Sequence, residues 1–301
     1  MKLWSNYHVA HSVTEALTLL GNYGGQAQII AGGTDLLIDL QQGNHEPKTA
    51  LIDITKVPEM ALIEQDGDTL IIGAGVTHSS IVATPIIQER ATCLVESCGV
   101  VGGPQVRNVA TLGGNVAHAM PAADGTLSLV ALDAEAEVAS PDGRHWYPIQ
   151  QVFVGPGKSV IDPSRQVLTR FRLKLTGTHA GSAFHRIMRP QGVALPILGC
   201  AVSVALDDDE RFQTVGICLG PIGPTPARAV ELETRLIGRT ADPSVIAEIA
   251  DYGRQALHPR TSKYRATAEY RVEMIELLLR QSLTAAVNRA QGITTEPFSA
   301  E

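Results

Sequence analysis

The hydrophobic runs of this 301-residue chain are short, and their pattern changes twice along the sequence. Residues 1–56 alternate a helical run with short buried runs, residues 57–176 carry hairpin signals, and residues 181–290 combine long strands with amphipathic helices. A single continuous sheet does not accommodate three such patterns. The sequence therefore predicts an α+β fold with two subdomains in a first domain (1–56 and 57–176), a second domain at 181–290, and a tail at 291–301.

The first unit has the signals of a βαβ-like element. Ser12–Leu20 shows helical spacing of apolar residues, with Ser12 as the N-cap and Glu15 three residues later. Gln26–Ile30 and Leu51–Ile54 are short apolar runs typical of buried strands. We expect the helix to connect neighbouring strands of one small sheet.

The two later units are predicted from turn residues and from helical periodicity. Hairpin turns are expected at Gln65–Asp68, Pro141–Gly143 and Asp207–Glu210. Strands are expected over Val167–Leu175, Ile197–Leu206 and Phe212–Leu219. Helices are expected over Thr77–Val82, Pro85–Val95, Ala227–Ile237, Pro243–Ala256 and Lys263–Val287. The composition of Thr176–Gly181 indicates a linker between the two domains.

Composition excludes several classes of function. Hydrophobic residues make up 44% of the chain and charged residues 18%, which supports a packed core. A net charge of −7 disfavours nucleic acid and anionic membranes as partners. Four cysteines are too few for a disulfide scaffold and suit a reducing compartment. The chain has no membrane-spanning run, so we expect a cytoplasmic protein without membrane insertion.

Two segments place a Gly-Gly pair beside a hydroxyl residue, Ala31–Asp35 and Thr111–Asn115. Because glycines lack a Cβ atom, backbone N–H groups there can approach a phosphate, and a helix start adds its dipole. In the first segment we interpret Gly32–Thr34 as the cradle and Asp35 as the helix cap, since a carboxylate repels phosphate. Taken alone, each segment is more often an ordinary tight turn.

Other candidate motifs fail on their own residues. Ile71–Gly75 resembles a dinucleotide fingerprint, but His78 stands where the third glycine belongs. Gly155–Ser159 lacks the first glycine of a P-loop, and no cysteine follows Cys93 and Cys98 at the spacing of an iron–sulfur cluster. We recognise no metal site, nucleophile elbow or catalytic carboxylate pair. A bound cofactor is therefore expected to carry the chemistry.

The two glycine segments, together with their neighbours, resemble a known family. The similarity to FAD-binding subunits of the xanthine dehydrogenase / molybdenum hydroxylase family is carried by IIAGGTDLLIDL and by GGPQVRNVATLGGNVAHAMPAADG. It continues through VFVGPGKS and GPIGPTPARAVE into SKYRATAEYRVEMIELLL, so that it covers roughly residues 2–290.

This resemblance implies a fold and a cofactor site. The first domain would be a two-subdomain FAD-binding domain of the vanillyl-alcohol-oxidase (VAO) / PCMH type. The second would be a small α+β domain like that of CO dehydrogenase flavoproteins. FAD would be bound without a covalent tether. The implied cofactor-binding residues are Ile30, Ala31, Gly32, Gly33, Thr34, Asp35, Leu36, Leu37, Val101, Gly102, Ala110, Thr111, Gly114, Asn115, His118, Asp124, Leu168 and His185.

The resemblance also distributes roles among these residues. Ile30–Leu37 would wrap the pyrophosphate from one side, and Thr111, Gly114 and Asn115 from the other. Asp124 would contact a sugar or the polar linker of FAD. The remaining positions match backbone or apolar positions near the flavin, apart from two histidines.

Those two histidines depart from the family pattern. The family has Phe-Lys-x-x-x-Arg where this chain has Phe184–Arg189. By spacing, His185 takes the place of the lysine, although Arg186 serves after a shift of one residue. His118 stands where a small or hydroxylated residue is usual. A packed, hydrogen-bonded histidine without a role is the alternative at both positions.

The function implied is electron transfer within a multi-subunit complex. The flavin would receive electrons from 2Fe–2S clusters on a small partner subunit, which would take them from a molybdenum cofactor on a large partner subunit. It would pass them to NAD or another acceptor. One alternative is a self-contained FAD-dependent alcohol oxidase of the VAO type, which needs a base and often a His or Cys tether. Another is a subunit that holds FAD only as a structural group.

Overall fold

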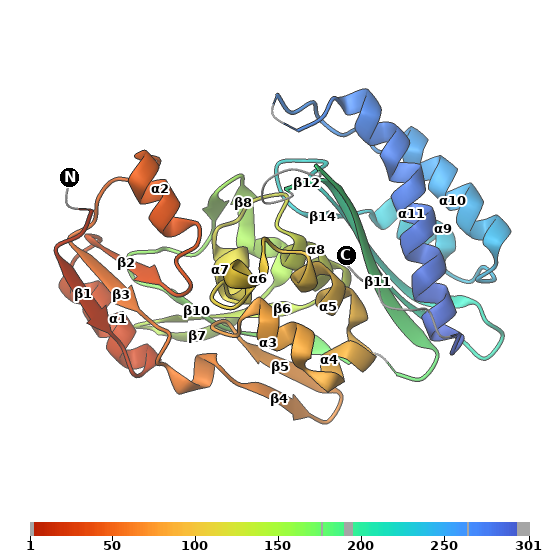
Figure 1. Cartoon of the computed structure of the whole chain (residues 1–301). Coiled ribbons are helices and arrows are strands. Elements are labelled where there is room, and N and C mark those ends of the chain that lie inside the picture. Colours follow the sequence, from red (N-terminus) through yellow and green to blue (C-terminus); the bar gives the residue numbers. More distant parts are fainter. Residues whose placement is uncertain (1–2, 176, 190–194, 264, 294–301) are drawn as a thin grey trace.

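The computed structural model describes residues 3–175, 177–189, 195–263 and 265–293. Within these ranges the strands form three larger sheets and one two-stranded ribbon. Figure 1 shows the three larger sheets following one another along the molecule, with helices between and beside them. The predicted α+β class is confirmed.

The first sheet is parallel, in the order β1-β3-β2. Its elements are β1 (Asn6–Val9), α1 (Val13–Asn22), β2 (Ala27–Ile30), α2 (Leu36–Gln42) and β3 (Ala50–Asp53). The Ser12 hydroxyl accepts the N–H of Glu15 at 3.1 Å, and the Glu15 carboxylate accepts the N–H of His11 at 2.8 Å. This reciprocal capping confirms the predicted helix start.

The second sheet is antiparallel, in the order β4-β5-β10-β6-β7. Its strands are β4 (Ile63–Asp66), β5 (Thr69–Gly73), β6 (Glu135–Ser140), β7 (Gly143–Pro148) and β10 (Val167–Lys174). The ribbon pairs β8 (Phe153–Gly155) with β9 (Lys158–Ser159). Two 3-10 turns, at Pro58–Met60 and Ile149–Val152, join these strands to their neighbours.

Six short helices lie between β5 and β6 in the sequence. They are α3 (His78–Ala83), α4 (Pro85–Arg90), α5 (Thr92–Gly99), α6 (Pro104–Arg107), α7 (Leu112–Ala117) and α8 (Asp124–Ala131). The single helix expected over Pro85–Val95 is wrong, because Ala91 adopts φ −148° and ψ 47° and separates two helices. The sequence also did not predict α7 and α8, which begin in a stretch rich in glycine and asparagine.

The third sheet is antiparallel, in the order β11-β12-β13-β14. The C-terminal elements are β11 (Ala180–Met188), β12 (Pro196–Leu206), β13 (Phe212–Gly220), β14 (Ala227–Arg228), α9 (Val230–Leu236), α10 (Pro243–Ala256) and α11 (Ala268–Ala290). Helix α11 packs on β11 and β12, and α10 packs on α11. Their apolar side chains form a core separate from that of the first domain.

Three expectations for this region need correction. The helix predicted from Lys263 begins at Ala268, because the Thr267 hydroxyl caps it by accepting the N–H of Tyr270 at 3.3 Å. Ala227 lies in strand β14 rather than in a helix. The predicted linker overlaps β11, which starts at Ala180; Thr176 itself lies outside the described residues.

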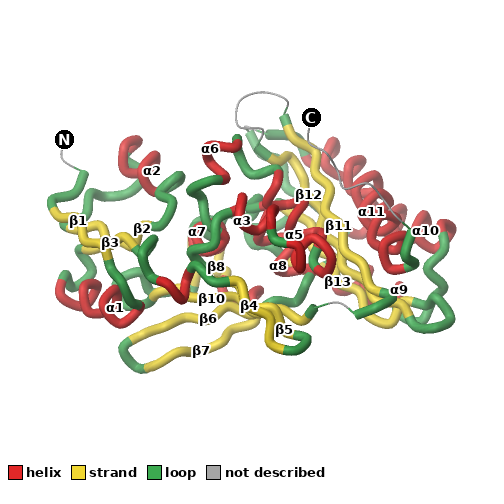
Figure 2. Tube along the Cα trace, turned by 60° about the horizontal axis from the view of Figure 1, so that its bottom comes forward, coloured by secondary structure: helices red, strands yellow, loops and turns green. Residues whose placement is uncertain are grey.

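Helix α8 of the first domain covers the other face of the third sheet (Figure 2). Glycines on β13 make this close approach possible. A Cβ atom at Gly216 would lie 2.1 Å from the carbonyl oxygen of Ala131, and one at Gly220 would lie 2.7 Å from that of Pro121. The two domains therefore meet along the segment that contains Asp124.

Strand β11 is an edge strand, and side chains from α5 and α11 occupy part of its free edge. The Glu96 carboxylate accepts the N–H of Phe184 at 2.7 Å and a guanidinium N–H of Arg289 at 2.6 Å. Arg289 in turn donates to the carbonyl of Ser182 at 2.6 Å. This buried network fixes β11 against the first domain and so positions the side chains that follow Phe184.

Candidate functional site

The structure brings the two glycine segments together. A Cβ atom at Gly32 would lie 2.1 Å from the carbonyl oxygen of Val109 and 2.8 Å from the Cα of Ala110. No side chain fits at position 32, since the backbone that precedes Thr111 occupies the space. Gly32 is thus required for contact between the two segments, independently of any ligand.

The first segment presents backbone donors that the protein does not use. Strand β2 ends at Ile30 and α2 begins at Leu36, and between them Gly33 adopts a left-handed φ of +69°. Among the hydrogen bonds of the described residues, none is donated by the N–H groups of Gly32, Gly33, Thr34 or Asp35. Consecutive unpaired N–H groups at a helix start favour an anion.

Asp35 does not cap α2 through its side chain. It occupies the N-cap position, but its carboxylate accepts no capping hydrogen bond. The interpretation of Asp35 as a capping side chain is therefore wrong. The carboxylate is largely exposed and lies 4.0 Å from Nε2 of His118, at the end of α7. His118 thus lies next to the first segment.

The second segment uses its own N–H groups internally. Leu112 donates to the carbonyl of Val76 at 3.0 Å, and Gly113 donates to that of Ala74 at 2.8 Å. Gly114 donates to the Thr111 hydroxyl at 3.0 Å. The Asn115 N–H donates to the Thr111 carbonyl at 3.0 Å. What this segment can offer a ligand is the Thr111 hydroxyl proton, the Asn115 side-chain amide nitrogen and the exposed face of Gly114.

The Asn115 side chain also organises the start of α8. Its Oδ1 accepts both the backbone N–H and the hydroxyl of Thr126 at 3.2 Å. Asp124 is the first residue of this helix and is 5% exposed. The second glycine segment thereby fixes the position of the Asp124 carboxylate.

Asp124 pairs with Arg186 across the domain boundary. An Nη1–H of Arg186 donates to Asp124 Oδ2 at 2.6 Å, and an Nη2–H donates to the carbonyl of Val100 at 2.7 Å. Asp124 Oδ1 is buried and has no hydrogen-bond partner among the described residues. Burial raises the pKa of Asp124 to about 6, although the Arg186 charge acts in the opposite direction.

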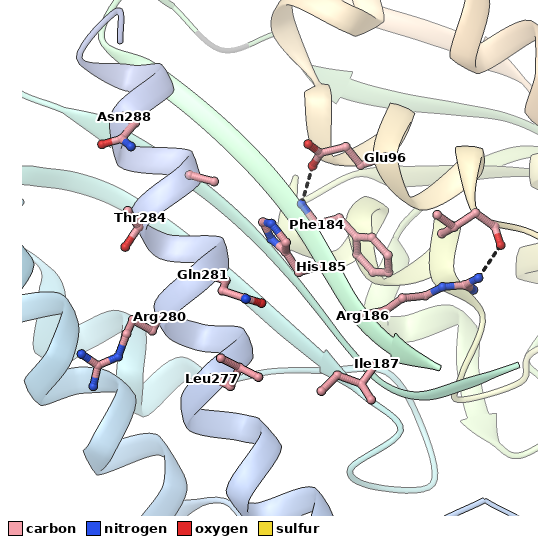
Figure 3. A pocket seen from close by; sticks show the side chains of 12 residues that line it. Glu96, Phe184, His185, Arg186, Ile187, Leu277, Arg280, Gln281, Thr284 and Asn288 are labelled. Atoms are coloured by element: carbon pink, nitrogen blue, oxygen red, sulfur yellow. Dashed lines mark hydrogen bonds between the residues drawn. The ribbon is translucent and has the colours of Figure 1, made fainter. Parts of the chain in front are cut away.

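His185 lies on the other side of β11. Figure 3 shows its ring toward α11, whereas Arg186 points toward α5. Nδ1 of His185 lies 3.2 Å from the Ser282 hydroxyl. Burial lowers the pKa of His185. His185 lines a cavity of about 660 Å³ between α5, β11 and α11, and no residue of either glycine segment lines that cavity. The structure thus brings Arg186, and not His185, to Asp124.

Hydrogen bonds and burial characterise the remaining predicted residues. Arg107 donates from Nη1 to the carbonyls of Val101 at 3.2 Å and Gly102 at 2.9 Å, which holds the turn after α5 in place. Ala110 and Leu168 are each 7% exposed. In the first segment Ile30 is buried, and Ala31, Leu36 and Leu37 are partly buried.

Sequence reasoning missed two groups at this site. The Val100 carbonyl carries no sequence signal, because it is a backbone acceptor brought to Arg186 by the fold. His78 is 1% exposed, and its backbone N–H donates to the carbonyl of Ala110 at 3.0 Å. Its ring atom Nδ1 has no hydrogen-bond partner among the described residues. Burial lowers the pKa of His78 to about 4, so its ring is neutral at pH 7.

These groups fit a bound dinucleotide such as FAD. A diphosphate would satisfy the unpaired N–H groups between Gly32 and Asp35, and a hydroxyl group would satisfy Asp124 Oδ1. In the described part of the chain, no group of three or more His, Cys, Asp or Glu side chains is arranged to hold a metal ion. Within the same ranges, no helix is long and apolar enough to span a bilayer.

Comparisons with known proteins cover almost the whole chain. Residues 3–173 match the family described as the FAD binding domain in molybdopterin dehydrogenase, and residues 182–286 match the CO dehydrogenase flavoprotein C-terminal domain. The chain is 30% identical over 280 residues to the carbon monoxide dehydrogenase medium chain of Hydrogenophaga pseudoflava, covering 93% of this chain and 96% of that one. It is also 30% identical over 292 residues to a putative xanthine dehydrogenase FAD-binding subunit of Escherichia coli K12, covering 96% and 98%.

A solved structure agrees with these matches. Carbon monoxide dehydrogenase from Hydrogenophaga pseudoflava, in a form that lacks the Mo-pyranopterin moiety of the molybdenum cofactor, superposes with a TM-score of 0.87 at 29% identity. The superposition covers 95% of this chain and 98% of that chain.

Proposed function

The chain belongs to the family of FAD-binding subunits of molybdenum hydroxylases, and from this premise we propose that it is the FAD-carrying electron-transfer subunit of such a complex. The observation that carries the proposal is the row of N–H groups from Gly32 to Asp35, which have no acceptor in the described part of the chain and lie against the second glycine segment. Ala110 and His118 lie next to this row, and Asn115 contacts the start of the helix that carries Asp124, which supports the proposal.

The chain's own residues would hold the cofactor as follows. The N–H groups from Gly32 to Asp35 would bind the diphosphate without a covalent bond. The Thr111 hydroxyl and the Asn115 amide would donate from the other side. Asp124 Oδ1 would accept a hydroxyl group, while Arg186 would keep the carboxylate ionised and add a positive charge nearby. FAD supplies a carrier that takes single electrons and releases two.

The proposal includes the partners and the acceptor. We assign the 2Fe–2S clusters to a small partner subunit and the molybdenum cofactor to a large one, with NAD or another acceptor receiving the electrons. The relatives named above differ in substrate, carbon monoxide in one and xanthine in the other, while sharing this subunit. We place the complex in the cytoplasm, because the four cysteines of this chain are free and buried, as is usual in a reducing compartment.

The hypothesis of a self-contained alcohol oxidase is less favoured. Such an enzyme needs a base close to the flavin and commonly a His or Cys residue bonded to it. Burial raises the pKa of Cys93 and Cys200 to about 12, and His185 faces α11 rather than Asp124. The names of the relatives also describe subunits of dehydrogenases.

Assays of the chain with and without its partners test this function. With FAD bound, the isolated chain should oxidise NADH with an artificial dye and should leave simple alcohols unchanged. Co-expression should recover two further polypeptides, one with iron and one with molybdenum. Alcohol turnover by the isolated chain would contradict the electron-transfer function, as would stoichiometric iron on the chain alone.

A further inference from the structure

A second cluster of charged side chains lies at the domain boundary, outside the proposed FAD site. It consists of four arginines: Arg189 just after β11, Arg260 and Arg265 in the loop between α10 and α11, and Arg271 in α11. Hydrogen bonds connect them in pairs. Arg271 donates from Nη1 to the carbonyl of Arg260 at 2.8 Å, and Arg189 donates from Nη2 to the carbonyl of Arg265 at 3.2 Å.

Close ion pairs are absent from this cluster in the described part of the chain, and Asp124 is the carboxylate whose charge acts on Arg265. Within the described ranges, none of the four guanidinium groups forms an ion pair within 4.0 Å, although most other arginines of the chain do. The nearby sequence positions 190–194 and 264 contain no acidic residue. In a chain with a net charge of −7, four clustered arginines without ion pairs among the described residues are unusual.

Arg271 is the most unusual member. It is 1% exposed, and its Nε and Nη2 have no hydrogen-bond partner among the described residues. Only its Nη1 is engaged, with the carbonyls of Arg260 and Pro221 (3.3 Å). Burial lowers the pKa of Arg271, and the charges of Arg265 and Arg260 lower it further. A buried cation among other cations is costly unless an anion lies nearby.

The surrounding backbone holds these cations in place. Arg265 donates from Nη1 to the carbonyl of Pro196 at 3.1 Å. Its loop is closed by a hydrogen bond from the N–H of Ser262 to the carbonyl of Ala266 at 2.9 Å. The Ala268 N–H donates to the Thr261 hydroxyl at 3.0 Å. These bonds fix the loop backbone and the Arg265 guanidinium.

The cluster adjoins the proposed FAD site. The Arg265 charge partly offsets the rise in the pKa of Asp124 that burial causes. Arg271 holds the carbonyl of Pro221, and the preceding Gly220 packs against the carbonyl of Pro121 in the first domain. An anion bound here would thus lie beside the segment that leads to Asp124.

We propose that Arg189, Arg260 and Arg265, with Arg271 beneath them, form a binding site for phosphate groups that is separate from the Gly32–Asp35 cradle. Arg260 is exposed and Arg265 partly buried, so both can reach a ligand, while Arg271 adds its unneutralised charge from below. The planar forks of arginines match the geometry of phosphate oxygens. The phosphates can belong to a nucleotide or to free phosphate, and the proposal does not depend on the identity of the electron acceptor.

Calorimetric titrations of the full chain loaded with FAD test this site. Inorganic phosphate, inorganic pyrophosphate and ADP-ribose are titrated separately at low salt. Arg260→Ala and Arg265→Ala should each weaken pyrophosphate binding about tenfold or more, since each removes a charge-assisted contact. Arg280→Ala, which removes an exposed arginine of α11 that pairs with Glu276, is the matched control and should leave binding unchanged.

Each outcome bears on the proposal. Tighter binding of ADP-ribose than of pyrophosphate would identify a nucleotide site, and equal binding would identify a phosphate site. No binding of any of the three anions would overturn the proposal, as would binding that Arg260→Ala and Arg265→Ala do not weaken. Loss of partner subunits in those variants without anion binding would also overturn it and would indicate an acidic protein surface.

A further variant tests the charge imbalance without removing Arg271. Arg260→Glu places a carboxylate beside Arg271 and Arg265, so it should raise the Tm and abolish pyrophosphate binding together. An unchanged or lower Tm would contradict the charge imbalance. FAD content is measured for every variant. A variant that loses pyrophosphate binding but keeps FAD bears on the phosphate site alone, so the two proposals are tested separately.

Discussion

The two glycine segments look alike in sequence but have different hydrogen bonding in the structure. Among the described residues, the four successive N–H groups from Gly32 to Asp35 have no acceptor, whereas the N–H groups from Leu112 to Asn115 all donate to other groups of the protein. The first segment can therefore bind an anion directly. The second supports the first through Gly32 and positions Asp124 through Asn115.

This difference shows that a Gly-Gly pair indicates a close contact with the backbone. It does not indicate whether the neighbouring group is another part of the protein or a ligand. At Gly113 the neighbour is the carbonyl of Ala74, where a Cβ atom would lie 2.5 Å away. At Gly33 the glycine allows a left-handed turn that directs the following N–H groups outward. Both pairs allow close backbone packing, and the first segment in addition leaves N–H groups without an acceptor among the described residues.

The largest effect is expected where the two segments touch. Gly32→Val places a Cβ atom within 2.1 Å of the Val109 carbonyl, so it should destabilise the fold by about 3 kcal/mol and abolish FAD binding. Thermal unfolding and flavin content measure both effects. A stable variant that retains FAD would break the comparison, because it would mean that the segments can separate without consequence.

A pH-dependent effect is expected beside the second segment. His78 has a pKa of about 4 in the folded protein and about 6.5 when unfolded, so the unfolded state binds more protons between these values. Above pH 6.5 the neutral His78 therefore does not lower the free energy of unfolding. As the pH falls from 6.5 toward 4, the free energy of unfolding falls by up to about 3 kcal/mol because of this residue.

His78→Gln should remove this acid sensitivity. The stability of the variant relative to the wild type should rise as the pH falls from 6.5 to 4, as measured by Tm or by denaturant midpoints. The raised pKa of Asp124 acts in the opposite direction in both proteins and cancels in the difference. A pH-independent difference would show that His78 is not held neutral.

The unpaired donors of the first segment are tested with proline. Asp35→Pro removes one N–H at a position whose φ of −94° is close to the range of proline, and it should weaken FAD binding about tenfold. Asp35→Ala keeps the N–H and should bind FAD as well as the wild type or better. Gly114→Ala in the second segment should change affinity less than Asp35→Pro. A larger loss of FAD affinity in Gly114→Ala than in Asp35→Pro would mean that the second segment, and not the first, binds the diphosphate.

The smallest effect concerns the flavin potential. Arg186→Met removes a positive charge beside Asp124, so the potential should fall by ~30 mV for each ~1.4 kcal/mol of lost stabilisation of reduced FAD. His185→Lys should leave it unchanged, because His185 faces Ser282. Spectroelectrochemical titration of both variants distinguishes them. A shift in His185→Lys alone would return the flavin contact to His185.

The sequence predicted local helices and strands better than it predicted hydrogen-bond partners that are distant along the chain. The capped helix after Ser12 and the strand ending at Ile30 follow from nearby residues, and both are present. The roles of the glycine segments depend on acceptors at Ala74 and Val76, far along the chain. Local sequence carries no record of such pairings.

The choice between His185 and Arg186 shows the same limit. Adjacent residues on a strand point to opposite faces, so the choice depends on how β11 pairs with β12. Spacing to Arg189 favoured His185, but the pairing shifts register between Ile187 and Met188. Counting back from Arg189 therefore cannot identify which side chain faces Asp124.

Acid release of the flavin tests whether this chain binds one FAD without a covalent bond. Purified protein is precipitated with acid, and flavin is quantified in the supernatant and in the pellet. We expect about one FAD per chain in the supernatant and none in the pellet. Flavin that stays with the pellet, or a chain that never takes up FAD, would contradict it.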